Sequence, residues 1–362
     1  MRFRLGMMAI VATAALVAAA AGIASATTAA TTRWRFSYTS RTAMTAFYGI
    51  TALSAHDAWA VGSYAPEGGP GARPIVERWN GRSWSAVTLP KRYRTNAQLT
   101  AIAASSPTNV WVFGFSRDSN GLNPQTFALR WNGSWSARGD WHTSNVVNSA
   151  TVLNSGNVWI FGTDWTLHYN GTRWITRKLS FSIAQASAIN RNDIWAVGAS
   201  NSDLSPVLAR LHNGRWQLQY IPVTSSNTTR AALLGVLARS DTNIWVVGAT
   251  SASSGFHPLA LHLLNGKWTF HTPSGIQALS SVAPDGAGGL WATTASSQFD
   301  GSRLEHYSGG HWHAVVLPTV TGKATSVTTL ARAPRSTTVF AAGIVLWGGL
   351  PETEATILKY QS

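Results

Sequence analysis

A six-residue phrase returns seven times along the chain and constrains the fold more than any other feature of the sequence. In its first copy, at residues 57–62, an acid stands two positions before a tryptophan, and a glycine stands three positions after it. The copies are spaced on average about 48 residues apart, as expected when each repeat is one supersecondary unit. The central aromatic residues of the seven copies are Trp59, Trp111, Trp159, Trp195, Trp245, Trp291 and Phe340.

A second phrase, in which a turn pair stands just before another tryptophan, follows each of the first six copies. Its first copy begins with Trp79-Asn80-Gly81 and continues to Trp84. Asn-Gly between two apolar segments predicts a β-hairpin, because a type I′ turn requires positive φ at both central residues. The later turn pairs begin at Asn132, Asn170, Asn213, Asn265 and Gly309.

Each repeat is therefore predicted to contain four strands. The first is rich in small residues, as at residues 50–55, the second carries the first tryptophan, the third ends at the turn pair, and the fourth carries the last tryptophan. Four strands in a repeat of this length are typical of a propeller blade. We predict an all-β fold, a seven-bladed β-propeller with four antiparallel strands per blade, formed by residues 27–362 as a single domain.

The two ends of the repeat region complement each other. The seventh copy stops shortly after Tyr360, which occupies the aromatic position before the turn, so this copy lacks a fourth strand. Near the other end, Thr32-Arg33-Trp34 resembles Thr172-Arg173-Trp174, which begins a fourth strand. We predict that the N-terminal strand closes the ring in the last blade, with Trp34 in its outer strand, because closure removes exposed sheet edges.

Most tryptophans occupy equivalent positions in the repeats, which predicts that they pack between neighbouring blades rather than against a ligand. Trp141, Trp165 and Trp347 fall outside these positions and are freer for binding. The tryptophans to which we assign a structural role are Trp34, Trp59, Trp84, Trp111, Trp135, Trp159, Trp174, Trp195, Trp216, Trp245, Trp268, Trp291 and Trp312.

The position two residues before the turn pair carries a cation or a histidine in several repeats. A position that accepts Arg, Lys and His is most simply explained as facing solvent. The residues at this position include Arg78, Arg130, His168, His306 and Lys359.

The first 26 residues have the features of an export signal. Arg2 and Arg4 precede an apolar run from Met7 to Ala21, and Ala24-Ser25-Ala26 has the small-x-small form of a cleavage site. We predict a signal peptide at residues 1–26 and an extracellular mature protein. The longest later apolar run, at residues 339–350, contains three glycines and is too short to span a bilayer, so we expect no stable membrane insertion.

No pattern in the sequence points to a reaction centre. The chain has no Cys, which excludes a disulfide scaffold, a thiolate metal site and a cysteine nucleophile. His311 and His313 share one face of a strand, but no third metal ligand is evident. The 14 Asp and Glu residues are thinly spread, which leaves paired carboxylates for glycoside hydrolysis unsupported but open. We expect no catalytic residue, no metal and no cofactor.

The longer connections between strands should gather on one face of the disc, and loops on a rigid scaffold favour binding. The densest basic stretch there is Lys91-Arg92-Tyr93-Arg94, and a second candidate group follows in the next blade. Both suit an anionic or sugar ligand. The candidate binding residues are Lys91, Arg92, Tyr93, Arg94, Asp140, Trp141 and His142.

The two phrases resemble those of tryptophan-rich exported bacterial repeat proteins, which are treated as seven-bladed, kelch-like or galactose-oxidase-like propellers. The resemblance covers about residues 32–362 and implies a fold rather than a role. Most repeats lack the Gly-Gly pair of kelch blades. The galactose-oxidase copper site uses a Cys-crosslinked Tyr, and a chain without Cys cannot form it.

These observations predict a secreted, non-catalytic β-propeller that binds or interacts with other molecules. The formal net charge of +14 favours anionic cell-wall polymers or glycans as ligands, and an extracellular protein partner stays open. The alternative is a carbohydrate-active enzyme, a hydrolase or lyase, that uses the loop-rich face. Export argues against nucleic acid as a partner, and we expect a monomer.

Overall fold

Seven four-stranded antiparallel sheets account for the strands of the described part of the chain. The structure is a computed structural model of the 362-residue chain. It describes residues 33–65, 71–118, 123–141, 146–223, 230–252, 255–273, 277–294, 303–320, 323–347 and 353–361. The predicted signal peptide and His142 lie outside the described residues, as does the side chain of Trp347.

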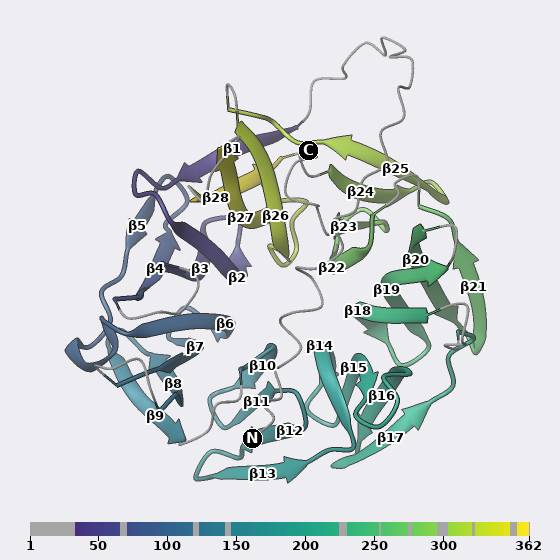
Figure 1. The fold of residues 1–362 in the computed structure, drawn as a ribbon, viewed down its shortest axis with the longest axis horizontal. Helices are drawn as coiled ribbons and strands as arrows, with labels where there is room; N and C mark the ends of the chain where they lie inside the picture. The colour runs from purple at the N-terminus through teal and green to yellow at the C-terminus, as the bar shows by residue number, and fades with distance from the viewer. Residues whose placement is uncertain are drawn as a thin grey trace.

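The strands occupy four concentric positions in the ring (Figure 1). The innermost strands are β2 (Thr45–Ser54), β6 (Ala97–Ser106), β10 (Ser149–Asn154), β14 (Phe181–Asn190), β18 (Arg230–Ser240), β22 (Leu279–Pro284) and β26 (Lys323–Arg332). The second strands are β3 (Asp57–Tyr64), β7 (Asn109–Ser116), β11 (Asn157–Phe161), β15 (Asp193–Ser200), β19 (Asn243–Ala252), β23 (Leu290–Thr294) and β27 (Val339–Trp347). The third strands are β4 (Arg73–Trp79), β8 (Gln125–Trp131), β12 (Trp165–Tyr169), β16 (Pro206–His212), β20 (Gly255–Leu264), β24 (Arg303–Ser308) and β28 (Thr353–Tyr360). The outer strands are β5 (Trp84–Ala86), β9 (Trp135–Trp141), β13 (Trp174–Lys178), β17 (Arg215–Gln219), β21 (Lys267–His271), β25 (His311–Val316) and β1 (Trp34–Thr39).

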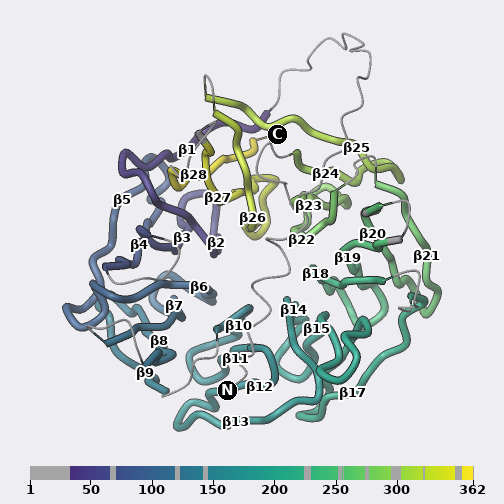
Figure 2. The backbone as a smooth tube through the Cα atoms, viewed as in Figure 1, coloured from purple at the N-terminus to yellow at the C-terminus, as the bar shows by residue number. Residues whose placement is uncertain are grey.

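The structure confirms the predicted seven-bladed propeller and its closure. Blade 1 is β2 to β5, the next five blades follow in chain order, and blade 7 combines β26, β27 and β28 with β1. Trp34 is paired with Tyr360 and Arg35 with Lys359 in this last sheet. Figure 2 shows the two ends of the described chain meeting in one blade.

An aromatic side chain on each second strand packs against the next blade. Trp59 of blade 1 lies 5.6 Å from Trp131 and 6.2 Å from Trp135 of blade 2, measured between ring centroids. Trp291 of blade 6 lies 5.2 Å from Trp34 in the closing strand. In blade 7, Phe340 lies 5.8 Å from Trp84 of blade 1, so the same contact continues across the closure.

The glycine that ends the first phrase is explained by close packing inside the sheet. The innermost strand has a β-bulge opposite this glycine, for example between Phe47 and Gly49 of β2. An added Cβ on Gly62 would lie 1.8 Å from the backbone oxygen of Ala46. Gly114, Gly198, Gly248 and Gly343 have equally close backbone neighbours, so a side chain at this position would force the two strands apart.

The Asn-Gly turns divide into two kinds. Asn213-Gly214 and Asn265-Gly266 have positive φ at both residues, as the type I′ prediction requires. In blades 1, 2 and 3 only the glycine has positive φ, so the type I′ prediction is wrong there. In blades 1 and 3 an extra residue also precedes the tryptophan. In blade 3 the Asn170 side chain accepts hydrogen bonds from the backbone N–H groups of Thr172 and Arg173 and so stabilises a wider turn.

The prediction that the cation-or-histidine position faces solvent is wrong. The His168 ring stacks on Trp159 with a centroid separation of 3.9 Å, and its Nε2 lies 3.1 Å from Asn157 Oδ1. In the ladders this position is the one paired with the aromatic residue of the second strand, so it is Arg210 in blade 4 and His262 in blade 5, each three residues before its turn pair. Arg210 lies over Trp195 at 5.2 Å and pairs with Asp193. The flat face of each side chain covers the buried indole, and the acid or amide of the first phrase binds its polar edge.

We expect Trp34→Ala to destabilise the ring by about 3–5 kcal/mol, because it opens a cavity where the first and last strands meet. Trp34 is only 1% exposed. Urea denaturation followed by tryptophan fluorescence measures the loss. The control is Tyr220→Ala, at a residue that is 77% exposed, which should change the free energy of unfolding by less than about 0.5 kcal/mol. Equal effects of the two substitutions would contradict the closure.

We expect the protein to lose stability between pH 6.5 and pH 4 partly through His262. Burial, with the nearby charges of His271 and Arg239, lowers the pKa of His262 from 6.5 to about 4. The unfolded chain therefore binds more protons than the folded chain in this window, so stability falls as the pH falls. Urea denaturation at pH 7.5 and pH 5 should show a smaller loss for His262→Gln than for the wild type. The control His311→Gln, at an exposed position, should behave as the wild type does.

Candidate binding site

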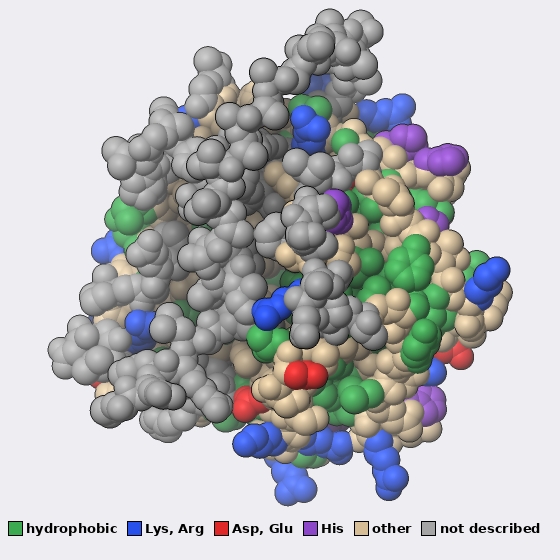
Figure 3. Space-filling view, turned by 45° about the vertical axis from the view of Figure 1, so that its right-hand side comes forward, with side chains coloured by type: hydrophobic (Ala, Val, Ile, Leu, Met, Phe, Trp, Pro, Cys, Tyr) green, Lys and Arg blue, Asp and Glu red, His purple; other side chains and the backbone are tan. Residues whose placement is uncertain are grey.

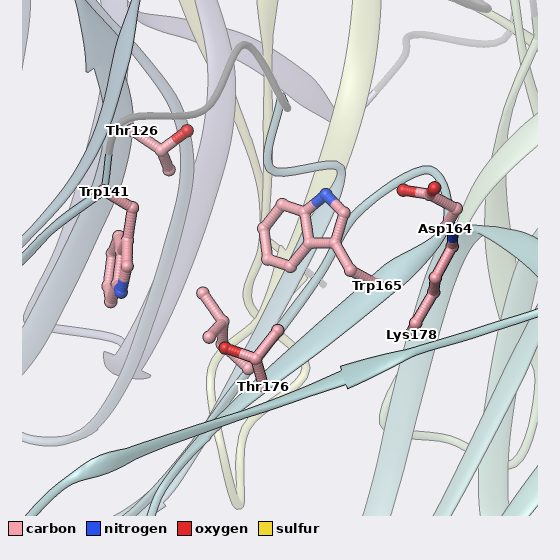
Figure 4. A pocket seen from close by; sticks show the side chains of 7 residues that line it. Thr126, Trp141, Asp164, Trp165, Thr176 and Lys178 are labelled. Carbon is pink, nitrogen blue, oxygen red and sulfur yellow. The ribbon is translucent and has the colours of Figure 1, made fainter.

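Two tryptophans outside the repeated positions come together between blades 2 and 3. A pocket of about 270 Å³ opens there, at the face that carries connections such as residues 87–96 and 201–205, which we call the loop face. Figure 4 shows Trp141 and Trp165 on opposite sides of this space, with Thr176 between them. We call it the tryptophan pocket, and its lining residues are Thr126, Trp141, Asp164, Trp165, Leu167, Thr176 and Lys178.

Trp141 reaches the tryptophan pocket from the end of outer strand β9. Its ring lies edge-on to Trp174 of blade 3, with the centroids 5.1 Å apart and the planes at 89°. Gly139 makes room for this orientation, because a Cβ on Gly139 would lie 2.1 Å from a Trp141 ring carbon. The indole is thus held by the scaffold while one part of it remains open to solvent.

Trp165 forms the other wall and begins strand β12 directly after a tight connection. Gly162 donates a backbone hydrogen bond to the Trp165 carbonyl over 3.0 Å, and a Cβ on Gly162 would meet the Trp165 ring at 2.3 Å. The side chain is 6% exposed, and its indole nitrogen has no hydrogen-bond partner among the described residues. This wall is therefore closely packed, and only a small part of the Trp165 ring faces the pocket.

Polar groups of three kinds accompany the two indoles. Asp164 supplies a half-buried carboxylate, Lys178 an exposed ammonium group, and Thr176 an exposed hydroxyl. Neither Asp164 nor Lys178 belongs to an ion pair between described residues. The pocket can therefore offer one acceptor, one cationic donor and one hydroxyl to a ligand that also has an apolar face.

Contacts to other parts of the protein fix much of the predicted basic stretch at residues 91–94. Lys91–Tyr93 forms a single turn of 3-10 helix, η2, and Tyr93 is buried with its ring 4.6 Å from that of Phe127. Burial raises the pKa of Tyr93. The Arg94 Nε donates a hydrogen bond to the Leu89 carbonyl over 2.6 Å. Lys91 and Arg92 keep exposed side chains.

The structure brings the two predicted groups together through one ion pair. Arg92 pairs with Asp140, which lies on β9 of blade 2, while Trp141 next to it on the strand contacts blade 3. Neighbouring residues of a strand point to opposite faces of the sheet, so Asp140 and Trp141 serve different interfaces. Of the predicted binding residues that the structure describes, only Trp141 lines the tryptophan pocket.

The sequence alone gives a partial signal for the residues that line the tryptophan pocket. Trp165 and Trp141 both stand outside the repeated tryptophan positions, and the structure places them in one pocket. Asp164, Thr176 and Lys178 carry no such mark, because Asp164 lies in a short connection and the other two are ordinary residues of the outer strand β13. Their convergence depends on how blades 2 and 3 meet.

A metal site or a membrane-spanning helix in the described part of the chain would point to a different kind of function. No group of three or more His, Asp or Glu side chains there is arranged to hold a metal ion. No helix among the described residues is long and apolar enough to cross a membrane.

Comparisons with known proteins support the fold. No protein-family model matches the chain, and no curated protein matches it. Among solved structures, the chain is similar to the extracellular domain of a putative hybrid two-component system from B. thetaiotaomicron, with 12% identity and a TM-score of 0.61 over 91% of this chain and 40% of that one. It is also similar to YCF48 from Cyanidioschyzon merolae, with 14% identity and a TM-score of 0.59 over 91% and 98% of the two chains. The WD40 propeller domain of Doa1 has 10% identity and a TM-score of 0.57 over 91% and 98%.

We expect the Arg92–Asp140 ion pair to contribute less than about 1 kcal/mol, since exposed pairs are screened by water. The two side chains are 65% and 28% exposed. A double-mutant cycle with Arg92→Ala and Asp140→Ala, read by urea denaturation, gives the coupling energy. Tyr93→Ala should cost about 3 kcal/mol by comparison, because its ring is packed in the core between blades 1 and 2. A coupling larger than the Tyr93 effect would show that charge, not packing, anchors this connection.

Proposed function

We propose that this protein is an exported, non-catalytic propeller that binds glycans, and that the tryptophan pocket holds one sugar unit. The observation that carries the proposal is the placement of two indoles from adjacent blades around a carboxylate, an ammonium group and a hydroxyl. The export signal predicted at residues 1–26 supports an extracellular setting for such binding.

The chemistry of a sugar ring fits this arrangement. A pyranose presents C–H groups on its faces and hydroxyl groups around its edge. The C–H faces pack against aromatic rings, while the hydroxyls exchange hydrogen bonds with carboxylate, ammonium and hydroxyl groups. The volume of about 270 Å³ is just below the range of pockets for drug-sized ligands, which suits a single sugar unit of a longer chain.

Binding fits the pocket better than hydrolysis does. Glycoside hydrolysis normally requires two carboxylates on either side of the scissile bond. Asp164 is the one carboxylate among the described residues that line the tryptophan pocket. One similar solved structure is a GH74 enzyme from Niastella koreensis, but at 13% identity the likeness concerns the fold.

The test is a glycan-array screen with residues 27–362, followed by titration of the best ligand with Trp141→Ala. Loss of stacking by one indole should weaken binding by at least about tenfold, which corresponds to 1.4 kcal/mol. The matched control is Phe270→Ala, which removes an aromatic side chain that is 57% exposed on blade 5. Circular dichroism verifies that both variants keep the fold.

Three outcomes would overturn the proposal. The first is that no glycan binds, and the second is that both variants bind as tightly as the wild type. The third is release of reducing sugar from a bound glycan that stops with Asp164→Asn, which would establish the enzymatic alternative.

A further inference from the structure

A groove lined by several Lys and Arg side chains lies where the ring closes, in a different part of the ring from the tryptophan pocket. It has a volume of about 620 Å³ and lies between blade 7 and blade 1. Arg33 and Gln361 flank the closing pair of strands, at the place where the other blades have a covalent turn such as residues 80–83 or 170–173. We call it the seam groove, and its lining residues are Arg33, Arg35, Phe36, Ser37, Trp79, Arg82, Lys359 and Gln361.

Two cations stand directly opposite each other in the seam groove. Arg35 of β1 is paired with Lys359 of β28 in the antiparallel ladder. Like charges in directly opposed positions destabilise a sheet. The Lys359 ammonium group also lies 5.0 Å from the centroid of the buried Trp79 ring, and burial lowers its pKa. The folded protein therefore keeps an unfavourable concentration of positive charge here.

The other blades provide an internal comparison for this pair. The residue of the outer strand opposite the cation-or-histidine position is Ser85 in blade 1, Ser136 in blade 2 and Gln217 in blade 4. In blades 3, 5 and 6 it is Ile175, Thr269 and His313. Arg35 in blade 7 is thus the one Arg or Lys at this position among the seven described ladders.

The charge in the seam groove is also left without a counterion by the described residues. In blades 1 and 4 the corresponding arginines pair with Asp57 and Asp193. The first phrase begins with Thr338 in blade 7, whereas it begins with an acid or amide in blades 1 to 5. In blade 6 it begins with Gly289, and Asp285 supplies the carboxylate that contacts His306. No ion pair between described residues includes Arg33, Arg35, Arg82 or Lys359, and the first three have exposed side chains.

We propose that the seam groove binds an anionic polysaccharide, whose repeated carboxylate or phosphate groups accept hydrogen bonds from Arg33, Arg35 and Arg82. A guanidinium group matches the geometry of both anions, because it presents parallel N–H donors. A bound anion between Arg35 and Lys359 neutralises the opposed charges and converts an unfavourable contact into a favourable one. This site is separate from the tryptophan pocket, so each of the two proposals can fail without the other.

The groove suits a polysaccharide better than a nucleic acid or a membrane. Sequence-independent binding of single strands relies on exposed aromatic rings on which bases stack. Trp79 is only 7% exposed, and Lys359 covers it. The large apolar side chains that are exposed among the described residues, such as Leu218 and Phe270, lie outside the groove. Its own aromatic side chains, Phe36 and Trp79, are half-buried and buried, so the groove offers little apolar surface to lipid. Elsewhere on the surface Lys and Arg side chains gather near β13 and β17 as well (Figure 3), which makes a charge-matched control necessary.

The test measures binding of polygalacturonate and of phosphomannan, a phosphate-bearing polysaccharide, to residues 27–362, with dextran as the neutral polymer. Arg33→Ala combined with Arg82→Ala should weaken binding of the preferred anion at least about tenfold. Arg173→Ala combined with Arg215→Ala removes two exposed arginines near the turns of blades 3 and 4 and should change affinity less than about twofold. The two polymers distinguish carboxylate from phosphate as the recognised group.

A second variant separates this proposal from general charge attraction. Arg35→Ser copies blades 1 and 2 at this position, so it should raise the melting temperature of the free protein by about 1–2 °C at low salt. The same variant should weaken anion binding. Loss of affinity without a gain in stability would contradict the role of the opposed cations. Equal weakening by both double variants, or tighter binding of single-stranded DNA or of phosphatidylglycerol vesicles than of either polymer, would overturn the proposal.

Discussion

Packing of an aromatic ring on the second strand of each blade against the outer strands of the next blade is the contact on which the whole ring depends. Trp59, Trp111 and Trp245 each bury a ring in this way between successive blades. A side chain of the same blade covers one face of such a ring, as His168 covers Trp159, but the next blade is needed to bury the rest, so the contact must continue around the circle. Trp34 completes it by packing on Trp291, and Phe340 extends it to blade 1. An open chain of sheets would leave one such surface exposed at each end.

Much of this architecture could be predicted because the repeated turn pairs and aromatic residues mark where each strand begins or ends. The paired positions of Trp34 and Tyr360 followed from a strand missing at one end and present at the other. The reason for Gly62 did not follow, since it depends on a bulge in the neighbouring inner strand. The environment of His168 was also mispredicted, because residue type alone does not show that an imidazole can cover an indole as a guanidinium does.

The candidate sites were harder to predict than the fold, and the reason is geometric. Asp140 and Trp141 are adjacent in the sequence, yet the pleat of β9 sends them to different blades. Tyr93 belongs to a basic stretch but packs in the core. Trp165 and Lys178 come together with Trp141 only because blades 2 and 3 meet there. Residues that interrupt the repeat therefore located this pocket better than residues that cluster in a loop.

The pairing of β1 with β28 has a consequence for how the chain reaches its native state. Residues 34–39 leave the ribosome long before residues 353–360, although the two segments are hydrogen-bonded neighbours. Contacts this distant in sequence carry a large loop-closure entropy and slow folding. The first described strand to be synthesised must wait as an unpaired edge until the last one arrives, and throughout that interval it is open to pairing with other chains.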